Sequence, residues 1–130
     1  PACPIVIRMK QLNLSIMKAF VLIFRVNSST DMKPSPEQMQ ERMDWLGSIA
    51  AQNKLVSKGN SLSFGEAKTV KPGHVVTDGP YTEIKEFVSG FIIIQTATIE
   101  EAVEIAKKNP IFKSGGSIEV RAVLTPGDNQ

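Results

Sequence analysis

The sequence predicts an α+β fold in which two helices cover one face of an antiparallel sheet. Two apolar runs of strand length, Lys18–Arg25 and Phe87–Thr96, are rich in β-branched and aromatic residues, and each indicates a strand buried on both faces. Two further segments have helical spacing, and each follows a helix-start signal. At 130 residues the chain is about one domain long, so a single core must serve all of these elements.

The first helix is predicted to begin after Ser35. Ser35 and Gln38 have the spacing of a capping box, and Pro36 suits the first turn. Apolar residues then recur at intervals of three and four, and this stripe is expected to face the core. The stripe consists of Met39, Met43, Leu46 and Ala50. The polar residues Glu41, Arg42 and Asp44 are expected to face elsewhere. We expect the helix to end near Asn53.

Two modest strands are predicted between this helix and the second apolar run. The first lies within 54–64, a short stretch that glycines interrupt. The second lies within 70–77, which has strand composition although Pro72 and Gly73 fall inside it. The boundaries of short strands are the part of such a prediction that local sequence fixes least.

The second helix is predicted from Thr98 and Glu101, which have the spacing of another capping box. It is expected to end at Asn109, because Pro110 disfavours a helical residue before it. Two glycines then turn the chain into 117–124, where apolar and polar residues alternate. That alternation predicts a half-exposed final strand.

The predicted order is strand, helix, β-rich hairpin, strand, helix, strand, which matches the ferredoxin-like split βαβ plan. In that plan the first and third main strands are central, and here those are the two most apolar strands. Two helices can cover only one face of such a sheet, so apolar side chains on the other face need a second cover. We therefore expect a two-fold homodimer in which the open sheet faces pack together.

This domain is expected to span 17–125, between an N-terminal extension at 1–16 and a C-terminal tail at 126–130. Met17 is followed at once by a strand pattern, which indicates that the preceding residues are an upstream extension, non-native or disordered. Their apolar patch lacks the ordered basic, apolar and cleavage regions of a signal peptide.

Composition argues against several classes of function. Fifteen basic and 13 acidic residues leave a net charge of +2, and the basic residues are scattered, which disfavours nucleic-acid binding. Apolar runs are too short to span a membrane. The single cysteine, Cys3, has no partner for a disulfide or a metal cluster, so a cytoplasmic protein is expected. Walker, GxGxxG and GxSxG motifs are absent, and no cofactor is predicted.

The most distinctive string is VVTDGPYTEIKE at 75–86, followed by Gly90 and Phe91 and later by GGSIEVRAV at 115–123. Together with SPEQMQERMDWL in the first helix and FVLIFR in the first strand, these strings resemble the DGPF subgroup of the YCII-related family. The resemblance runs from Met17 to about Leu124. The chain departs from the usual pattern in having Tyr81 in place of phenylalanine, Ser89 in place of glycine and Ala122 in place of proline.

The resemblance implies a ferredoxin-like domain that pairs into a dimeric α/β barrel, with a cleft near the Asp-Gly-Pro turn. It implies no established activity for the subgroup. Some YCII-related proteins carry a histidine and aspartate pair thought to be catalytic. The first helix of this chain has no histidine, so that pair does not carry over.

Asp78 is the candidate catalytic residue, because it stands where an apolar strand gives way to a Gly-Pro turn. Its carboxylate could bond backbone two residues further on, as aspartates commonly do in turns. It could instead face a cleft and act as a general acid or base. The candidate ligand-binding residues around it are Arg25, Gly79, Pro80, Tyr81, Glu83 and Lys85.

Tyr81, Glu83 and Lys85 recur at spacing two, so an extended segment places them on one side. They are expected either to solvate a charged loop or to serve a ligand, with Lys85 or Arg25 binding an anionic group. Arg25 ends an apolar strand, where its charge must reach water or a carboxylate. His74 is the single histidine, and one histidine makes no metal site.

Two functions from different classes fit these residues. A dimeric small-molecule binding or regulatory module needs only a cleft. The alternative is a cofactor-free enzyme that uses Asp78 for proton-transfer or lyase chemistry on a small organic substrate. A structural role beside a transcription factor rests on analogy. Trp45 and Phe64 could line a pocket, although aromatic residues near an apolar helix stripe more often belong to the core.

Overall fold

The computed structural model describes residues 17–27, 35–63, 65–79 and 86–125, with Glu86 described by its backbone only. No helix in these ranges is long and apolar enough to cross a membrane.

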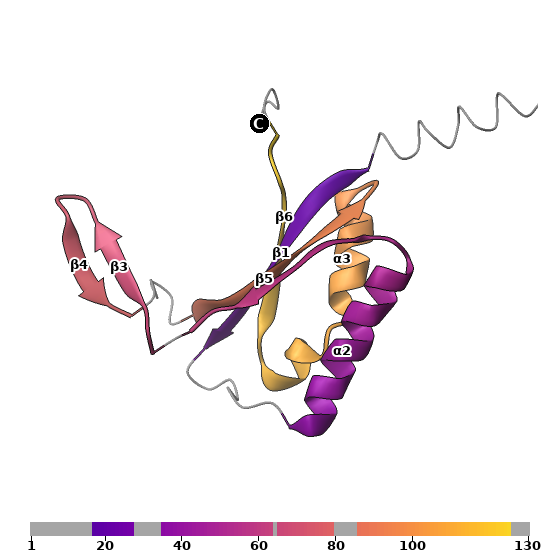
Figure 1. Cartoon of the computed structure of the whole chain (residues 1–130), viewed down its shortest axis with the longest axis horizontal. Helices are drawn as coiled ribbons and strands as arrows, with labels where there is room; N and C mark the ends of the chain where they lie inside the picture. The colour runs from indigo at the N-terminus through magenta and orange to yellow at the C-terminus, as the bar shows by residue number, and fades with distance from the viewer. Residues whose placement is uncertain (1–16, 28–34, 64, 80–85, 126–130) are drawn as a thin grey trace, which may run out of the picture.

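Four antiparallel strands form the main sheet in the order β2, β5, β1, β6. Their bounds are Lys18–Asn27 for β1, Leu55–Ser61 for β2, Glu86–Thr96 for β5 and Ser117–Ala122 for β6. Helices α2 (Pro36–Ala51) and α3 (Ile99–Lys107) lie together on one face of the sheet (Figure 1). This is the predicted ferredoxin-like arrangement, with the two most apolar strands paired at the centre.

The core lies between the sheet and the two helices. Alternate residues of β1 and β5 point toward the helices, and the register pairs Phe20 with Ile94 and Leu22 with Ile92. The buried cluster comprises Phe20, Leu22, Trp45, Ile49, Ile92, Ile94, Ala102 and Ala106. The two alanines allow α3 to approach the sheet closely, since they add little bulk at the contact.

Helix α2 buries a different stripe from the predicted one. Met39 and Met43 are 54% and 63% exposed, and Ala50 is also exposed, whereas Trp45 and Ile49 are buried. Of the predicted stripe, only Leu46 packs against the core. The predicted stripe was therefore wrong. The physical reason is that burying the large ring of Trp45 removes more apolar surface from water than burying a flexible methionine, and this decides how the helix is rotated.

Both predicted helix starts are confirmed. Ser35 Oγ accepts a hydrogen bond from the Gln38 amide at 3.1 Å, and Gln38 Oε1 accepts one from the Ser35 amide at 2.9 Å. At α3, Thr98 Oγ1 accepts from the Glu101 amide at 3.2 Å. Glu101 itself reaches one residue further back, where its Oε2 accepts from the Ala97 amide at 3.3 Å.

Helix α3 ends two residues before Asn109, the predicted end. Asn109 instead caps a short 3-10 helix, η1 (Pro110–Ser114), by accepting a hydrogen bond from the Ile111 amide at 2.7 Å. Pro110 thus begins a new element instead of only terminating the helix. This turn places η1 beside the N-terminal half of α2.

The stretch 70–77, predicted as one strand, is a hairpin of β3 (Lys68–Lys71) and β4 (Val75–Asp78). Gly73 and His74 have positive φ angles of 82° and 62°, and they reverse the chain between the two strands. The prediction of a single strand was wrong because the turn residues inside it outweigh its β propensity. The hairpin stands apart from the main sheet, on the side away from the helices (Figure 1).

Candidate functional site

A cavity of about 550 Å³ lies on the helix side of the sheet, between the N-terminal half of α2, the 3-10 helix η1 and strand β2. We call it the helix-side cavity. Its size falls within the roughly 300 to 1,000 Å³ of typical small-molecule sites. It is built from segments distant in sequence: the end of β1, α2, the stretch 58–62 at the end of β2 and just after it, the 89–92 stretch of β5, and 109–114.

The inner wall of the cavity is apolar and aromatic. Phe24 and Trp45 meet edge to face, with ring centroids 6.2 Å apart and an interplanar angle of 70°. The Trp45 indole nitrogen donates a hydrogen bond to the Ile105 carbonyl at 2.9 Å, which ties the ring to α3. Leu46 and Ile92 continue this wall. The indole is thus fixed and has its polar group satisfied, so it offers an apolar surface to the cavity.

The β2 side of the cavity depends on a close approach of two strands. Gly59 has a φ of 55°, and a Cβ added there would collide with the backbone carbonyl of Phe91. Likewise, a Cβ added at Gly90 would lie only 2.9 Å from the backbone carbonyl oxygen of Asn60. The β2 and β5 register also shifts between Ser57 and Asn60. This irregularity turns the 58–62 stretch into a cavity wall.

Polar side chains also line the cavity. Gln38 and Ser114 both line the cavity and bridge α2 to η1, with Nε2 and Oγ 3.5 Å apart. Ser89 lines it from β5 and donates to the Phe24 carbonyl at 3.4 Å. Asn60 and Ser61 are exposed on β2. These hydroxyl and amide groups can orient a ligand whose body rests on the aromatic wall.

Two cations, Arg42 and Lys58, also line the cavity, one on α2 and the other on β2. Both are exposed, and neither has an ion-pair partner within the part of the chain that the structure describes. The described lining residues include no aspartate or glutamate. The cavity therefore has a positive rim and an apolar floor.

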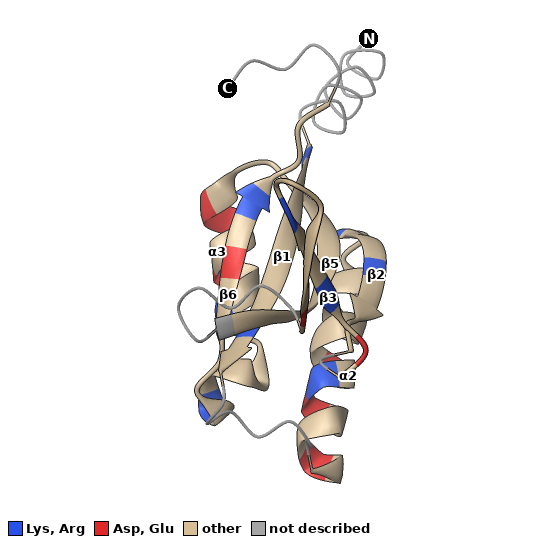
Figure 2. Cartoon of the chain, turned by 90° about the vertical axis from the view of Figure 1, so that its left-hand side faces the viewer, with Lys and Arg blue, Asp and Glu red and all other residues tan. Residues whose placement is uncertain are grey.

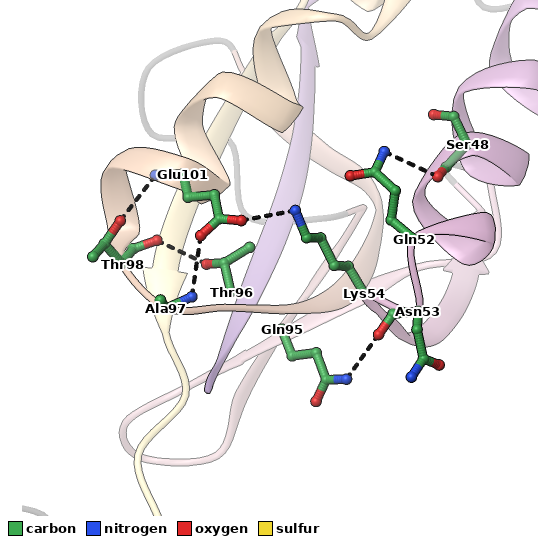
Figure 3. A network of polar contacts seen from close by, with 9 residues as sticks. All are labelled: Ser48, Gln52, Asn53, Lys54, Gln95, Thr96, Ala97, Thr98 and Glu101. Atoms are coloured by element: carbon green, nitrogen blue, oxygen red, sulfur yellow. Dashed lines mark hydrogen bonds and ion pairs between the residues drawn. The ribbon is translucent and has the colours of Figure 1, made fainter. Parts of the chain in front are cut away.

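A polar network joins the C-terminal end of α2 to the sheet and to α3, at the opposite end of α2 from the cavity (Figure 3). Lys54, just after α2, places its Nζ 2.7 Å from Glu101 Oε1 on α3. The Lys54 ammonium, chiefly through this hydrogen bond, lowers the pKa of the Glu101 carboxyl below 4.5. Gln95 Nε2 donates to the Asn53 carbonyl at 2.9 Å. The connection from α2 to β2 is thereby tied to the end of β5 and to the first turn of α3.

Asp78, the predicted catalytic residue, lies at the end of β4 with its side chain 92% exposed. Its carboxylate is 2.5 Å from Lys68 Nζ across the hairpin. Gly79 has a φ of 86°, and its amide donates to the Ala67 carbonyl at 2.8 Å. A hollow of about 490 Å³ beside these residues is lined by Gly65, Glu66, Ala67, Lys68, Asp78 and Gly79. A carboxylate this exposed, paired with an exposed lysine, is typical of a solvated surface pair.

Arg25 contacts Glu119 and not Asp78 among the described ion pairs. Its guanidinium lies 2.8 Å from Glu119 Oε1 through one terminal nitrogen and 3.0 Å through Nε. The pair is on the face away from the helices, because Glu119 is opposite Ile23 in the β1 and β6 register. Pro80, Tyr81, Glu83 and Lys85 lie outside the described residues. Their roles, and an acid/base role for Asp78, stay predictions.

The cavity residues other than Trp45 were not singled out as ligand contacts in the sequence. Gln38, Arg42, Trp45 and Ile49 recur at intervals of three and four, so they share one face of α2. Helical spacing counted from the tryptophan, instead of from the methionines, would have found this face. Lys58 gave no such signal, because its place depends on the irregular pairing of β2 with β5.

The described side chains do not form a metal site. In the described ranges, no group of three or more histidine, cysteine, aspartate or glutamate side chains is placed to hold a metal ion.

Comparison with known proteins identifies related sequences. The family model of the YCII-related domain matches residues 19–125. An uncharacterized protein of Rhizobium meliloti (strain 1021) is 42% identical over 60 residues, a match that covers 42% of this chain and 46% of that protein. The chain thus matches less than half the length of this relative.

Proposed function

The chain belongs to the YCII-related family, and we propose that it is a dimeric small-molecule binding or regulatory module. The observation that supports binding is the helix-side cavity, which combines a fixed aromatic wall with polar side chains and two cations that have no ion-pair partner among the described residues. Such a combination of apolar walls and a few convergent polar groups is the usual character of a ligand site. Binding of this kind needs no activated nucleophile.

A metabolite screen by thermal shift tests the binding proposal. We expect at least one class of small molecule to raise the unfolding temperature in a concentration-dependent manner, because a ligand that binds only the folded state stabilises it. Ser61→Phe places a ring at the cavity wall and should abolish the shift. Ser63→Phe alters an exposed serine outside the lining residues and should retain it. Equal shifts in both variants would place binding elsewhere.

The homodimer is proposed from the open face of the sheet. Val21 and Ile23 on β1 pair with Ile93 and Phe91 on β5, and all four side chains are partly exposed. Figure 2 shows charged positions along β6, and the middle of β1 is uncharged. Arg25, near the end of β1, is paired with Glu119 of β6. A second copy stacked sheet to sheet would remove these apolar side chains from water.

Sedimentation analysis tests the dimer. The wild-type protein should sediment at twice the 14.2 kDa of the chain at micromolar concentration. Ile23→Asp should yield monomers, because a charge would be buried without a partner at the interface. Met43→Asp, at a 63% exposed position on α2, is the matched control and should remain dimeric. A wild-type monomer would contradict the proposal.

A further inference from the structure

We propose that the helix-side cavity selects an organic anion with a flat apolar body, such as an aromatic or other planar carboxylate, sulfonate or phosphate ester. This inference rests on the proposed binding function and adds the chemical class of the ligand. It comes from three features of the cavity: its charge, its aromatic wall and its size.

The charge argument begins with which cations are paired. Lys54, near the C-terminal end of α2, is paired with Glu101, and Lys113 of η1 is paired with Glu41 at 2.7 Å. Arg42 and Lys58 line the cavity and have no such partner within the described ranges. An anion placed between them would meet two positive charges from two different walls.

The cavity also strengthens that attraction. Coulomb interactions weaken in proportion to the effective dielectric constant, which is lower beside apolar walls than in bulk water. An arginine can moreover bind a carboxylate or a phosphate through two parallel hydrogen bonds. A cationic ligand would meet repulsion from both residues, and a neutral ligand would gain from neither.

The aromatic wall determines the rest of the ligand. Phe24 and Trp45 are held edge to face, and the indole nitrogen is already bonded to the Ile105 carbonyl. The wall that includes Leu46 and Ile92 therefore offers apolar surface and few free polar atoms. A small inorganic anion would leave this surface wet, whereas a flat apolar body would cover it and gain from its burial. About 550 Å³ accommodates one such molecule.

Three probes with the same ring and different charges test the proposal: para-nitrobenzoate, para-nitrobenzyl alcohol and para-nitrobenzylamine. Trp45 is the single tryptophan and lines the cavity, so quenching of its fluorescence by the nitro group reports binding there. We expect the anion to bind about tenfold or more tightly than the alcohol, since hydrogen bonds to charged groups are stronger than neutral ones. The amine should bind most weakly.

The charge-removing variant is Arg42→Gln combined with Lys58→Gln. It should weaken para-nitrobenzoate binding by about tenfold or more and leave binding of the alcohol unchanged. Lys71→Gln combined with Lys108→Gln is the matched control. It removes the same net charge at exposed lysines outside the cavity lining and should preserve the anion preference. Added salt should weaken binding of the anion to the wild type and spare the alcohol.

The outcomes separate the two proposals. If all three probes bind with similar affinity, the inference about ligand class is wrong and the binding function stands. If the anion preference survives Arg42→Gln with Lys58→Gln, these two residues do not cause it, and the charge argument for the cavity is wrong. If none of the probes gives saturable quenching up to millimolar concentration, the inference about ligand class fails, and the thermal-shift screen alone decides the binding function. An equal loss of anion binding in the control variant would attribute the preference to net charge and overturn the inference.

Discussion

The two ends of helix α2 meet the sheet in opposite ways. At the C-terminal end, Lys54 is joined to Glu101, and Gln95 is joined to the backbone of Asn53, so polar groups from separate segments satisfy one another (Figure 3). At the N-terminal end, Arg42 and Lys58 lack ion-pair partners among the described residues and border a cavity of about 550 Å³.

This contrast distinguishes cations that stabilise the fold from cations that are available to bind a ligand. A cation that is already paired contributes to holding elements together, and an approaching anion must displace its partner. An unpaired cation at a cavity rim costs little while it remains hydrated, and it can bind an anion without breaking an existing contact. We infer that the closed end maintains the position of α2, and that the open end is free to recognise other molecules.

The largest expected effect compares two apolar residues on the same helix. Ile49 is 1% exposed in the core, so Ile49→Ala should lower the free energy of unfolding by about 2 to 5 kcal/mol. Leu46→Ala should cost less, because Leu46 is half-buried and already borders the cavity. Urea denaturation of both variants measures the difference. Equal losses would indicate that the cavity end is as tightly packed as the core.

A smaller effect concerns the pH dependence of the closed end. The Lys54 ammonium lowers the pKa of the Glu101 carboxyl below 4.5 in the folded protein. The stabilisation is therefore fully present above about pH 4.5 and is lost as the pH falls through the lowered value. Glu101→Gln should be less stable than wild type at neutral pH by no more than about 1 kcal/mol, since the pair is partly exposed.

The stability gap between wild type and Glu101→Gln should narrow as the pH drops below 4.5. Denaturant unfolding across this range measures it, with Glu100→Gln at the adjacent exposed position as the control. A gap that stays constant with pH would show that the ion pair contributes nothing to acid sensitivity.

The open end should tolerate the loss of its charges. Arg42→Gln with Lys58→Gln should change the free energy of unfolding by less than about 0.5 kcal/mol, because both residues are exposed and unpaired in the described structure. Chemical denaturation without ligand is the measurement. A large loss would mean that these cations stabilise the fold, which would remove the contrast with Lys54.

The smallest effect is expected at Asp78, outside both ends. Asp78→Asn breaks an ion pair whose side chains are 92% and 66% exposed, so stability should change by a few tenths of a kcal/mol at most, about 0.3. Probe binding in the cavity should be unchanged. A loss of ligand-induced stabilisation in this variant would indicate that Asp78 takes part in ligand binding, as the sequence predicted.

The sequence predicted the site less well than the fold, and particular residues show why. The capping pattern of Ser35 with Gln38 and the apolar runs of β1 and β5 are local signals, and each was confirmed. The cavity is made by residues from α2, β2, β5 and η1, which no local pattern joins. Arg25 was expected near Asp78, yet its described partner is Glu119, which follows from the pairing of β1 with β6.

By itself, the sequence determined the order of the main strands and helices, the starts of both helices and the central place of the two apolar strands, because these depend on spacing and composition over a few residues. The tertiary structure decided which face of α2 is buried, that 70–77 turns back as a hairpin, and which cations lack an ion-pair partner among the described residues. Those outcomes depend on how Trp45 packs against Phe24 and on the irregular pairing of β2 with β5, contacts between residues far apart in the chain.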